Sequence, residues 1–289
     1  MTDGLYKGAM TVKLTRRLSF CSALFVLTGL AGGMAATVCH AQEASPWVAG
    51  NHSSLRLLAG SRGDGVLVGG IEIQLKPGWK TYWRTPGDSG IPPRFDFSKS
   101  DNVENVTVLW PAPTKFDDGA GGTAIGYANK VVLPLRIMPK DASKPVTLRA
   151  TVDYAICEKL CVPVEATGEV AFTANPSIHA ALLANALQSV PRPGKIGEGD
   201  FTIRAIRRED DKSVTVEVVS QTPADLFVEG PNPHWALPIP RLSEKLSGGL
   251  KRYSFKLDGI PPGETASGAK LKLTLVAPDQ AFEFSAHLE

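Results

Sequence analysis

The sequence predicts an all-β protein with two β-sandwich domains joined by a short linker that contains a helix. Three observations favour this fold class. From residue 54 onward, short runs alternate apolar and polar residues, which is the period of half-buried strands. Glycine and proline clusters separate these runs as turns. Apolar residues recur at helical spacing in the stretch 178–190, near the middle of the chain.

Residues 1–41 have the pattern of an export signal. Basic residues precede an apolar run from Leu18 to Leu30, and a stretch of small residues ends at Ala41. The apolar run is shorter than the roughly 20 residues that a membrane span needs. We therefore expect cleavage near Ala41, a periplasmic location and no stable membrane span afterwards. A retained anchor is the alternative interpretation.

Removal of this signal would leave a nearly neutral protein with one pair of cysteines. The sequence has 31 basic and 29 acidic residues, and the signal carries four basic residues and one acidic residue. A near-neutral protein gives no electrostatic reason to expect nucleic acid or an anionic membrane as a partner. Cys21 and Cys39 leave with the signal, so Cys157 and Cys161 remain in an oxidising compartment.

Strands are expected in order through the first half of the chain. Residues 67–75 alternate, residues 76–78 form a turn, and residues 79–84 resume as an aromatic-rich strand. Further strands are expected at residues 95–97, 106–110, 131–137, 146–157 and 161–172. The glycine-rich residues 114–127 are expected to form a long irregular loop. Pro134 favours a sheet edge for its strand.

A helix is expected to separate the two halves. Asn175 can cap this helix, with Pro176 at its first position, and the helical spacing ends at Pro191. Beyond it, strands are expected at residues 201–203, 214–218, 226–228, 253–257, 271–275 and 282–284. The expected organisation is a signal at residues 1–41, a first domain at 48–175, a helix and linker at 176–199, and a second β-sandwich at 200–289.

Cys157 and Cys161 are expected to face each other across a β-hairpin. The apolar residues of both strands are even-numbered, so the two odd-numbered cysteines leave the core face together. The three residues between them suit a hairpin loop. Opposed Cβ atoms in such a pair lie roughly 4.5–5.5 Å apart, and a disulfide needs about 3.8 Å. A bond is therefore reachable with some strain, which is typical of exchangeable disulfides.

Three interpretations of this pair remain open on the residues alone. A structural disulfide is common in exported proteins, but closing so small a loop stabilises by only about 2 kcal/mol. A redox-active pair suits a strained bond on the outer face. A copper site would use the two soft sulfurs, but Met138 is the one methionine outside the signal and the remaining histidines are scattered. We therefore expect neither a metal nor a cofactor.

Two motifs carry a resemblance to a known family. The stretch Thr147–Cys157, leading into Cys161-Val162-Pro163, resembles the cysteine hairpin of the N-terminal periplasmic domain of DsbD. The stretch Gly78–Gly90 is similar to one typical of the branch that contains the related copper-tolerance protein ScsB. The likeness covers most of residues 48–175 and, weakly, the remainder. It implies immunoglobulin-like sandwiches, so the full expectation is an all-β chain of two immunoglobulin-like domains.

The resemblance also implies a function and a site. Cys157 and Cys161 match the redox pair of the family, and the second is the one expected to bond the partner. The candidate cap loop and surroundings of the pair are Phe116, Asp117, Asp118, Tyr127 and Tyr154. This chain has fewer residues between its cysteines than DsbD, and its candidate cap segment is rich in glycine where the family has aromatic residues.

The implied activity is protein-disulfide reduction in the periplasm. The implied partners are a membrane electron carrier of the DsbD or ScsB type and periplasmic thioredoxin-like or disulfide-bonded proteins. Because the sequence ends after the second sandwich, the membrane carrier is expected to be a separate protein. The alternative is a non-enzymatic periplasmic binding module, for copper handling or assembly, in which the disulfide is structural.

Overall fold

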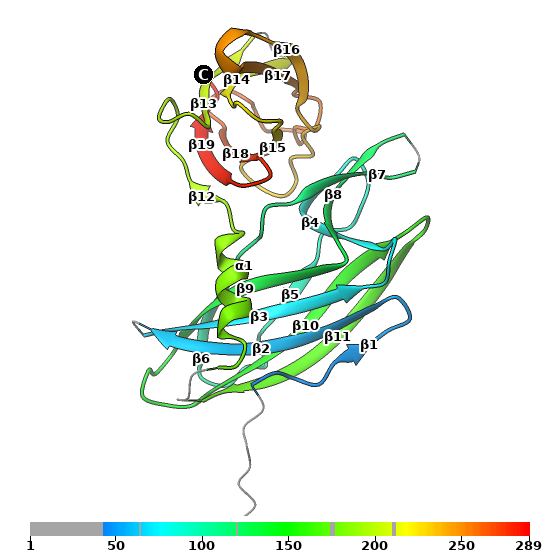
Figure 1. The fold of residues 1–289 in the computed structure, drawn as a ribbon, viewed down its shortest axis with the longest axis vertical. Coiled ribbons are helices and arrows are strands. Elements are labelled where there is room, and N and C mark those ends of the chain that lie inside the picture. Colours follow the sequence, from blue (N-terminus) through cyan, green and yellow to red (C-terminus); the bar gives the residue numbers. More distant parts are fainter. Residues whose placement is uncertain (1–42, 64, 120, 174–176, 210–211) are drawn as a thin grey trace, which may run out of the picture. The chain divides into compact units, whose positions relative to one another are not determined.

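The computed structural model describes residues 43–289 except residues 64, 120, 174–176 and 210–211, and this part of the chain is mostly strand (Figure 1). The strands form four sheets, two from residues 48–172 and two from residues 192–287. The predicted all-β fold class is confirmed. No helix in the described ranges has the length and apolar character needed to cross a membrane.

The first sheet has five strands, and all its neighbours are antiparallel. Their spatial order is β1 (Val48–Ala49), β2 (Ser53–Gly63), β3 (Val66–Leu75), β9 (Lys130–Pro139) and β6 (Val103–Val108). The predicted strand at residues 67–75 is confirmed as β3, but residues 69–73 are all buried, so this part of the strand is not half-buried.

β9 lies between β3 and β6, so the expected edge position of its strand is wrong. The pairing of β6 with β9 ends at Val108 and Leu135, and Leu135 is the residue directly after Pro134. The carbonyl of Pro134 accepts a hydrogen bond of 2.8 Å from the backbone of Leu109. The N–H and C=O of one strand residue point to the same neighbour, so the N–H that proline lacks would point past the end of β6. An interior strand therefore tolerates this proline.

The second sheet carries the cysteines. Its spatial order is β11 (Cys161–Phe172), β10 (Val146–Cys157), β4 (Lys80–Gly87), β8 (Thr123–Ala128) and β7 (Thr114–Asp117). The short β5 (Arg94–Asp96) also pairs with β10. The sheet has β11 at one end, and β10 and β11 form the long hairpin seen in Figure 1.

The two sheets enclose a hydrophobic core, and the parity predicted for the hairpin is confirmed. The even-numbered side chains of β10 are buried, whereas its odd-numbered side chains up to Asp153 are half-buried or exposed. Buried side chains of this core include Leu55, Leu57, Ile71, Trp83, Leu133, Leu135, Leu148 and Val152. The core therefore fixes which face of β10 and β11 is turned outward.

The segment that was expected to be an irregular loop is a hairpin. Residues 114–117 form β7 and residues 123–128 form β8, with Phe116 paired to Ala124 and Asp117 to Thr123. The glycines that suggested a loop belong to the turn, where Gly119 and Gly121 have φ angles of +80° and +89°. Glycine adopts such angles without strain, so this composition is typical of a tight turn as well as of a loop.

Helix α1 (Ala180–Gln188) follows the first pair of sheets. Its buried residues Leu183 and Ala186 pack with Leu58 and Val132 of the first sheet. Glycines at positions 60 and 70 leave room for the Leu183 side chain, since a Cβ at either position would lie 2.5 or 2.6 Å from it. The predicted helix is confirmed, with His179 as its N-cap. The predicted cap Asn175 and first residue Pro176 lie outside the described residues.

The remaining strands form two four-stranded sheets around a second core. One has the order β12 (Arg192–Pro193), β19 (Ala281–His287), β18 (Lys270–Val276) and β15 (Asp225–Glu229). The other has the order β13 (Thr202–Arg208), β14 (Ser213–Val219), β17 (Leu250–Lys256) and β16 (Arg241–Lys245), with a 3-10 turn, η1 (Ser247–Gly249), before β17. All strands predicted beyond residue 200 are present, and β16 is an additional one. The boundaries proposed for the domains stay a prediction.

Candidate functional site

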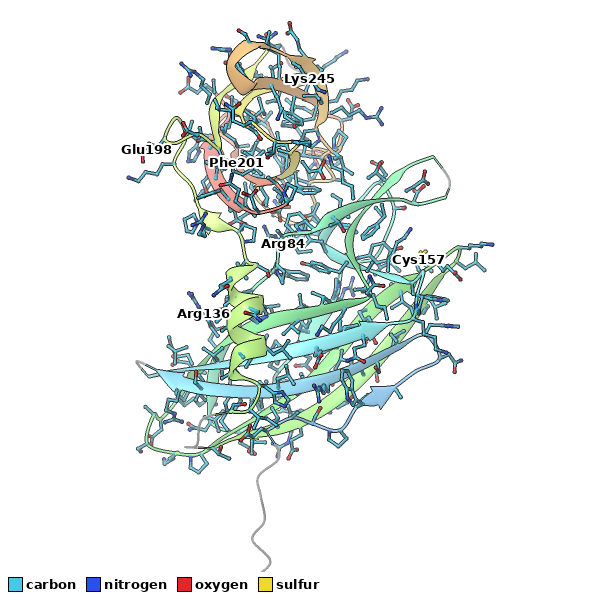
Figure 2. The ribbon with its side chains drawn as sticks, in the orientation of Figure 1. Arg84, Arg136, Cys157, Glu198, Phe201 and Lys245 are labelled. Carbon is cyan, nitrogen blue, oxygen red and sulfur yellow. The ribbon has the colours of Figure 1, made fainter. Side chains whose placement is uncertain are left out.

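The two cysteines close the β10–β11 hairpin. Cys157 and Cys161 are directly paired across it, with residues 158–160 as the loop, as the parity and spacing predicted. Their sulfurs are unbonded thiols 3.1 Å apart. Cys161 is exposed and Cys157 is half-buried. Figure 2 shows Cys157 at the end of the long hairpin. A pair this close needs only a small movement to form a disulfide.

Strand β4 supplies the neighbours of Cys157 on the same outer face. Cys157 pairs with Lys80, and Tyr82 lies two residues further along β4, so both point to the face that carries the sulfurs. The Tyr82 hydroxyl lies 2.9 Å from the sulfur of Cys161. Tyr82 packs with Ala124, Ala155 and Cys157 in a small cluster that is separate from the main core. A buried phenol is thus aimed at the exposed sulfur.

A loop covers the ring of Tyr82. Gly90 in this loop has a φ of +136°, and a Cβ there would lie 2.4 Å from the tyrosine ring. The loop is tied to the β7–β8 hairpin, because the Ser89 hydroxyl donates a 2.8 Å hydrogen bond to the carboxylate of Asp118. Asp88 in turn accepts a hydrogen bond of 2.9 Å from the backbone of Thr123. These contacts hold Tyr82 in place and leave it only 4% exposed.

The residues expected around the pair separate into two groups. Phe116 and Asp117 contact Lys80, whose ammonium lies 5.2 Å from the Phe116 ring and donates to the Asp117 carbonyl at 3.1 Å. Asp118 holds the covering loop through Ser89. These three residues therefore contact β4 and the loop that follows it, and these in turn contact the cysteines.

The hydroxyls of Tyr127 and Tyr154 bond elsewhere. Tyr127 donates to the carbonyl of Pro111 at 2.8 Å, and Tyr154 shares a 2.8 Å hydrogen bond with Ser53. Both side chains belong to the main core. The even number of Tyr154 already places it with Val152 and Ile156 on the core face of β10. Lys80 and Tyr82 of β4 are the side chains that the structure brings to the cysteines.

The environment of the site shifts two ionisation equilibria. Burial raises the pKa of the Cys157 thiol above its ordinary value of 9.0, and its hydrogen bond with Cys161 acts in the same direction. The Tyr82 hydroxyl and the positive charge of Lys80 act in the opposite direction. Burial also raises the pKa of Tyr82, and the neighbouring sulfurs add to this effect. Tyr82 therefore keeps its proton at neutral pH and can donate it to a sulfur in a hydrogen bond.

The raised pKa predicts the pH dependence of any step in which Cys157 attacks. Only the thiolate is nucleophilic. When Cys161 is disulfide-bonded to glutathione, the rate at which Cys157 attacks Cys161, releases glutathione and closes the disulfide should therefore rise with pH and level off above 9.0. Between 9.0 and the higher folded-state value, the native state binds more protons than the unfolded state, so the free energy of unfolding of the reduced protein should fall as pH rises. Stopped-flow closure rates and urea unfolding across this window measure both effects. A closure rate that levels off below pH 9 would contradict the expected burial effect.

Substitution of Gly90 by alanine should displace Tyr82. The new methyl group would overlap the tyrosine ring, and overpacking of this kind costs about 1–3 kcal/mol. The matched control is Gly119→Ala, because Gly119 also has a positive φ but has nothing within 4 Å of an added Cβ. We expect the Gly90 variant to unfold at lower urea concentration than the Gly119 variant and to exchange disulfides more slowly. Equal unfolding midpoints would show that the loop yields without moving the ring.

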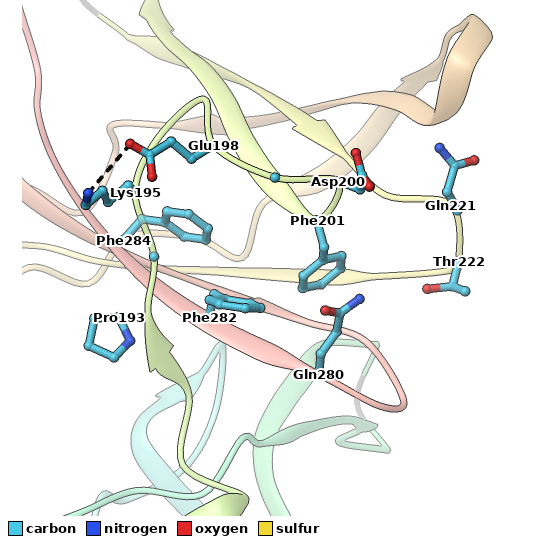
Figure 3. A pocket seen from close by; sticks show the side chains of 12 residues that line it. Pro193, Lys195, Glu198, Asp200, Phe201, Gln221, Thr222, Gln280, Phe282 and Phe284 are labelled. Atoms are coloured by element: carbon cyan, nitrogen blue, oxygen red, sulfur yellow. Dashed lines mark ion pairs between the residues drawn. The ribbon is translucent and has the colours of Figure 1, made fainter.

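A cavity of about 620 Å³ opens beside β13 and β19 (Figure 3). Phe201, Phe282 and Phe284 line it, with ring centroids of successive pairs 6.1 and 6.4 Å apart. Lys195 and Glu198 form an ion pair of 3.7 Å at its rim. The described residues contain two cysteines, Cys157 and Cys161, and neither of them lines this cavity. Within those residues, no group of three or more His, Cys, Asp or Glu side chains is placed to hold a metal ion.

Three comparisons relate this geometry to known proteins. Residues 62–172 match the family model described as thiol:disulfide interchange protein DsbD, N-terminal. The N-terminal periplasmic domain of ScsB from Proteus mirabilis superposes with a TM-score of 0.65 at 21% identity, covering 85% of this chain and 98% of that one, which shows a shared fold. A marsupial T cell receptor has a TM-score of only 0.22 at 10% identity. No curated protein matches the sequence.

The region matched by the family model begins in β2 and ends with β11, so it includes both cysteines, Lys80 and Tyr82. The hairpin motif that carried the resemblance lies within it. The resemblance is therefore confirmed, because residues 62–172 match the model of the DsbD N-terminal family.

Proposed function

We propose that this chain is a periplasmic thiol–disulfide interchange protein that carries reducing equivalents through Cys157 and Cys161. The observation that carries the proposal is the pair of free thiols, 3.1 Å apart, with one exposed on the outer face of the sheet. A structural bond has no need of an exposed sulfur or of a buried hydroxyl aimed at it. The match of residues 62–172 to a family of disulfide interchange domains supports the same function.

The reaction has two exchange steps. The Cys161 thiolate attacks a disulfide of a partner protein, which forms a mixed disulfide and releases one partner sulfur as a thiolate. The Cys157 thiolate then attacks Cys161, forms the Cys157–Cys161 disulfide and releases the second partner sulfur, so that the partner gains two electrons and two protons in all. Exposure suits Cys161 to the first step, and the 3.1 Å distance suits Cys157 to the second.

The surrounding side chains have supporting roles. Tyr82 donates a hydrogen bond to the Cys161 thiolate, and Lys80 places a positive charge beside Cys157. We propose that a membrane electron carrier of the DsbD or ScsB type restores the two thiols and that periplasmic thioredoxin-like or disulfide-bonded proteins receive the electrons. We also propose that residues 1–41 direct export and are removed near Ala41.

The reduction potential of the pair tests this function. Protein purified after export is equilibrated with glutathione buffers, and the Cys157–Cys161 state is followed by alkylation and mass spectrometry. Exchangeable pairs of known redox proteins lie between roughly −120 and −270 mV, whereas structural disulfides lie below about −300 mV. We expect a value in the first range. A value far below about −300 mV would show a structural bond and contradict the carrier role.

A further inference from the structure

The strand that carries the exposed sulfur has a free edge. β11 is the terminal strand of its sheet and pairs only with β10 among the described strands. The nearby β1 pairs with β2, in the other sheet. Two apolar side chains on either side of Cys161 are open to solvent, with Leu160 79% and Val162 38% exposed. Exposed strand edges with apolar neighbours are surfaces on which another chain can add a strand.

Pro163 indicates which backbone groups point out of this edge. Proline has no N–H, so inside a paired strand it is found where its N–H side faces away from the neighbouring strand. Residues two apart in a strand direct their N–H and C=O to the same side. Cys161 therefore directs its backbone N–H and C=O away from β10, as Pro163 does, and towards the free edge. No strand among the described residues lies beside these groups to bond them.

The geometry of sulfur exchange points to the same edge. In such a step the attacking, central and leaving sulfurs lie nearly in a line. Cys157 attacks Cys161 from β10, so the partner's sulfur must leave on the opposite side of Cys161, beyond β11. A partner disulfide that approached Cys157 from the side opposite Cys161 would instead meet Lys80 of β4. A partner disulfided to Cys161 is thus held over the free edge.

We propose that the edge of β11 at Cys161 is a docking strand, on which the cysteine-bearing segment of a partner protein lies extended and pairs with the backbone N–H and C=O of Cys161. This inference rests on the proposed function, because the mixed disulfide places the partner segment there. Leu160 and Val162 contact apolar side chains of that segment. Pro163 limits the pairing, since beyond Cys161 it offers a carbonyl but no N–H, which keeps the segment short and releasable.

Peptides with and without backbone donors test the docking strand. The Cys157→Ser variant, which retains Cys161, is charged with glutathione. It is then equilibrated with an eight-residue peptide of alternating threonine and valine that carries one central cysteine, and mass spectrometry maps the disulfide to Cys161. In one methylated peptide the N–H groups of the cysteine and of the residues two away are replaced by N-methyl groups. In the control peptide the methyl groups are on the residues directly beside the cysteine, whose N–H groups face away from β11.

We expect the unmodified and control peptides to displace glutathione with an equilibrium constant about 5- to 30-fold above that of the peptide methylated towards β11, as the loss of one or two hydrogen bonds implies. Equal constants for all three peptides would overturn the docking strand while leaving the proposed function intact. If instead the Cys157–Cys161 pair of the unmodified protein does not exchange with glutathione, the proposed function fails and the docking strand with it.

Discussion

Replacement of Cys161 by serine is expected to reduce disulfide exchange with glutathione and with partner proteins to the uncatalysed background. Cys161 is the exposed sulfur, and serine has a hydroxyl that is not ionised at neutral pH and cannot form the mixed disulfide. Cys157 remains in this variant, but it is half-buried, its pKa is raised by burial, and Lys80 lies on its far side. Reduction of a fluorescent disulfide by the reduced protein measures the loss.

The Cys157→Ser variant gives the complementary result. Its exposed Cys161 should still attack a disulfide, but the mixed disulfide should accumulate because the resolving thiol is absent. Mass spectrometry of the reaction mixture would show the adduct on Cys161. If Cys157→Ser abolished the first step and Cys161→Ser accumulated the adduct, the roles proposed for the two sulfurs would be reversed. If both variants kept full activity, the pair would not be the site of exchange.

The pairing of the cysteines could be predicted because it depends on local rules. A period of two along each strand and a three-residue loop place Cys157 opposite Cys161 and on the outer face, and the register agrees. Tyr154 follows the same rule on the opposite, buried face of β10. Its even number places it with the core residues of β10, and its hydroxyl bonds Ser53. A likeness to other proteins had suggested it for the site, but strand parity was the better guide.

The neighbours of the pair could not be predicted because they come from distant strands. Lys80 and Tyr82 reach the sulfurs since β4 pairs with β10 at Cys157, a register that no local pattern specifies. The loop predicted for residues 114–127 was wrong for another reason. Its glycines obscured two short strands, although Gly119 and Gly121 with positive φ are what a tight hairpin turn requires. Sequence therefore predicted how the two cysteines pair, whereas their neighbours on β4 depend on a long-range strand register.

Replacement of Tyr82 by phenylalanine is expected to slow the attack by Cys161 about 3- to 10-fold at neutral pH. The ring and its packing against Ala124 and Ala155 are kept, and only the hydroxyl 2.9 Å from the sulfur is lost. A hydrogen bond to a charged group contributes about 1.5–3 kcal/mol, so the hydroxyl stabilises the thiolate that attacks. A less stabilised thiolate is also more nucleophilic, and this offsets part of the loss.

A matched control separates this effect from a general loss of structure. Tyr154→Phe removes a hydroxyl that bonds Ser53 in the core, and its exchange rate should be unchanged. Urea unfolding of both variants shows whether the packing around each ring is kept. If Tyr82→Phe kept its unfolding midpoint and reacted as fast as the unmodified protein, the hydrogen bond would have no part in activating Cys161.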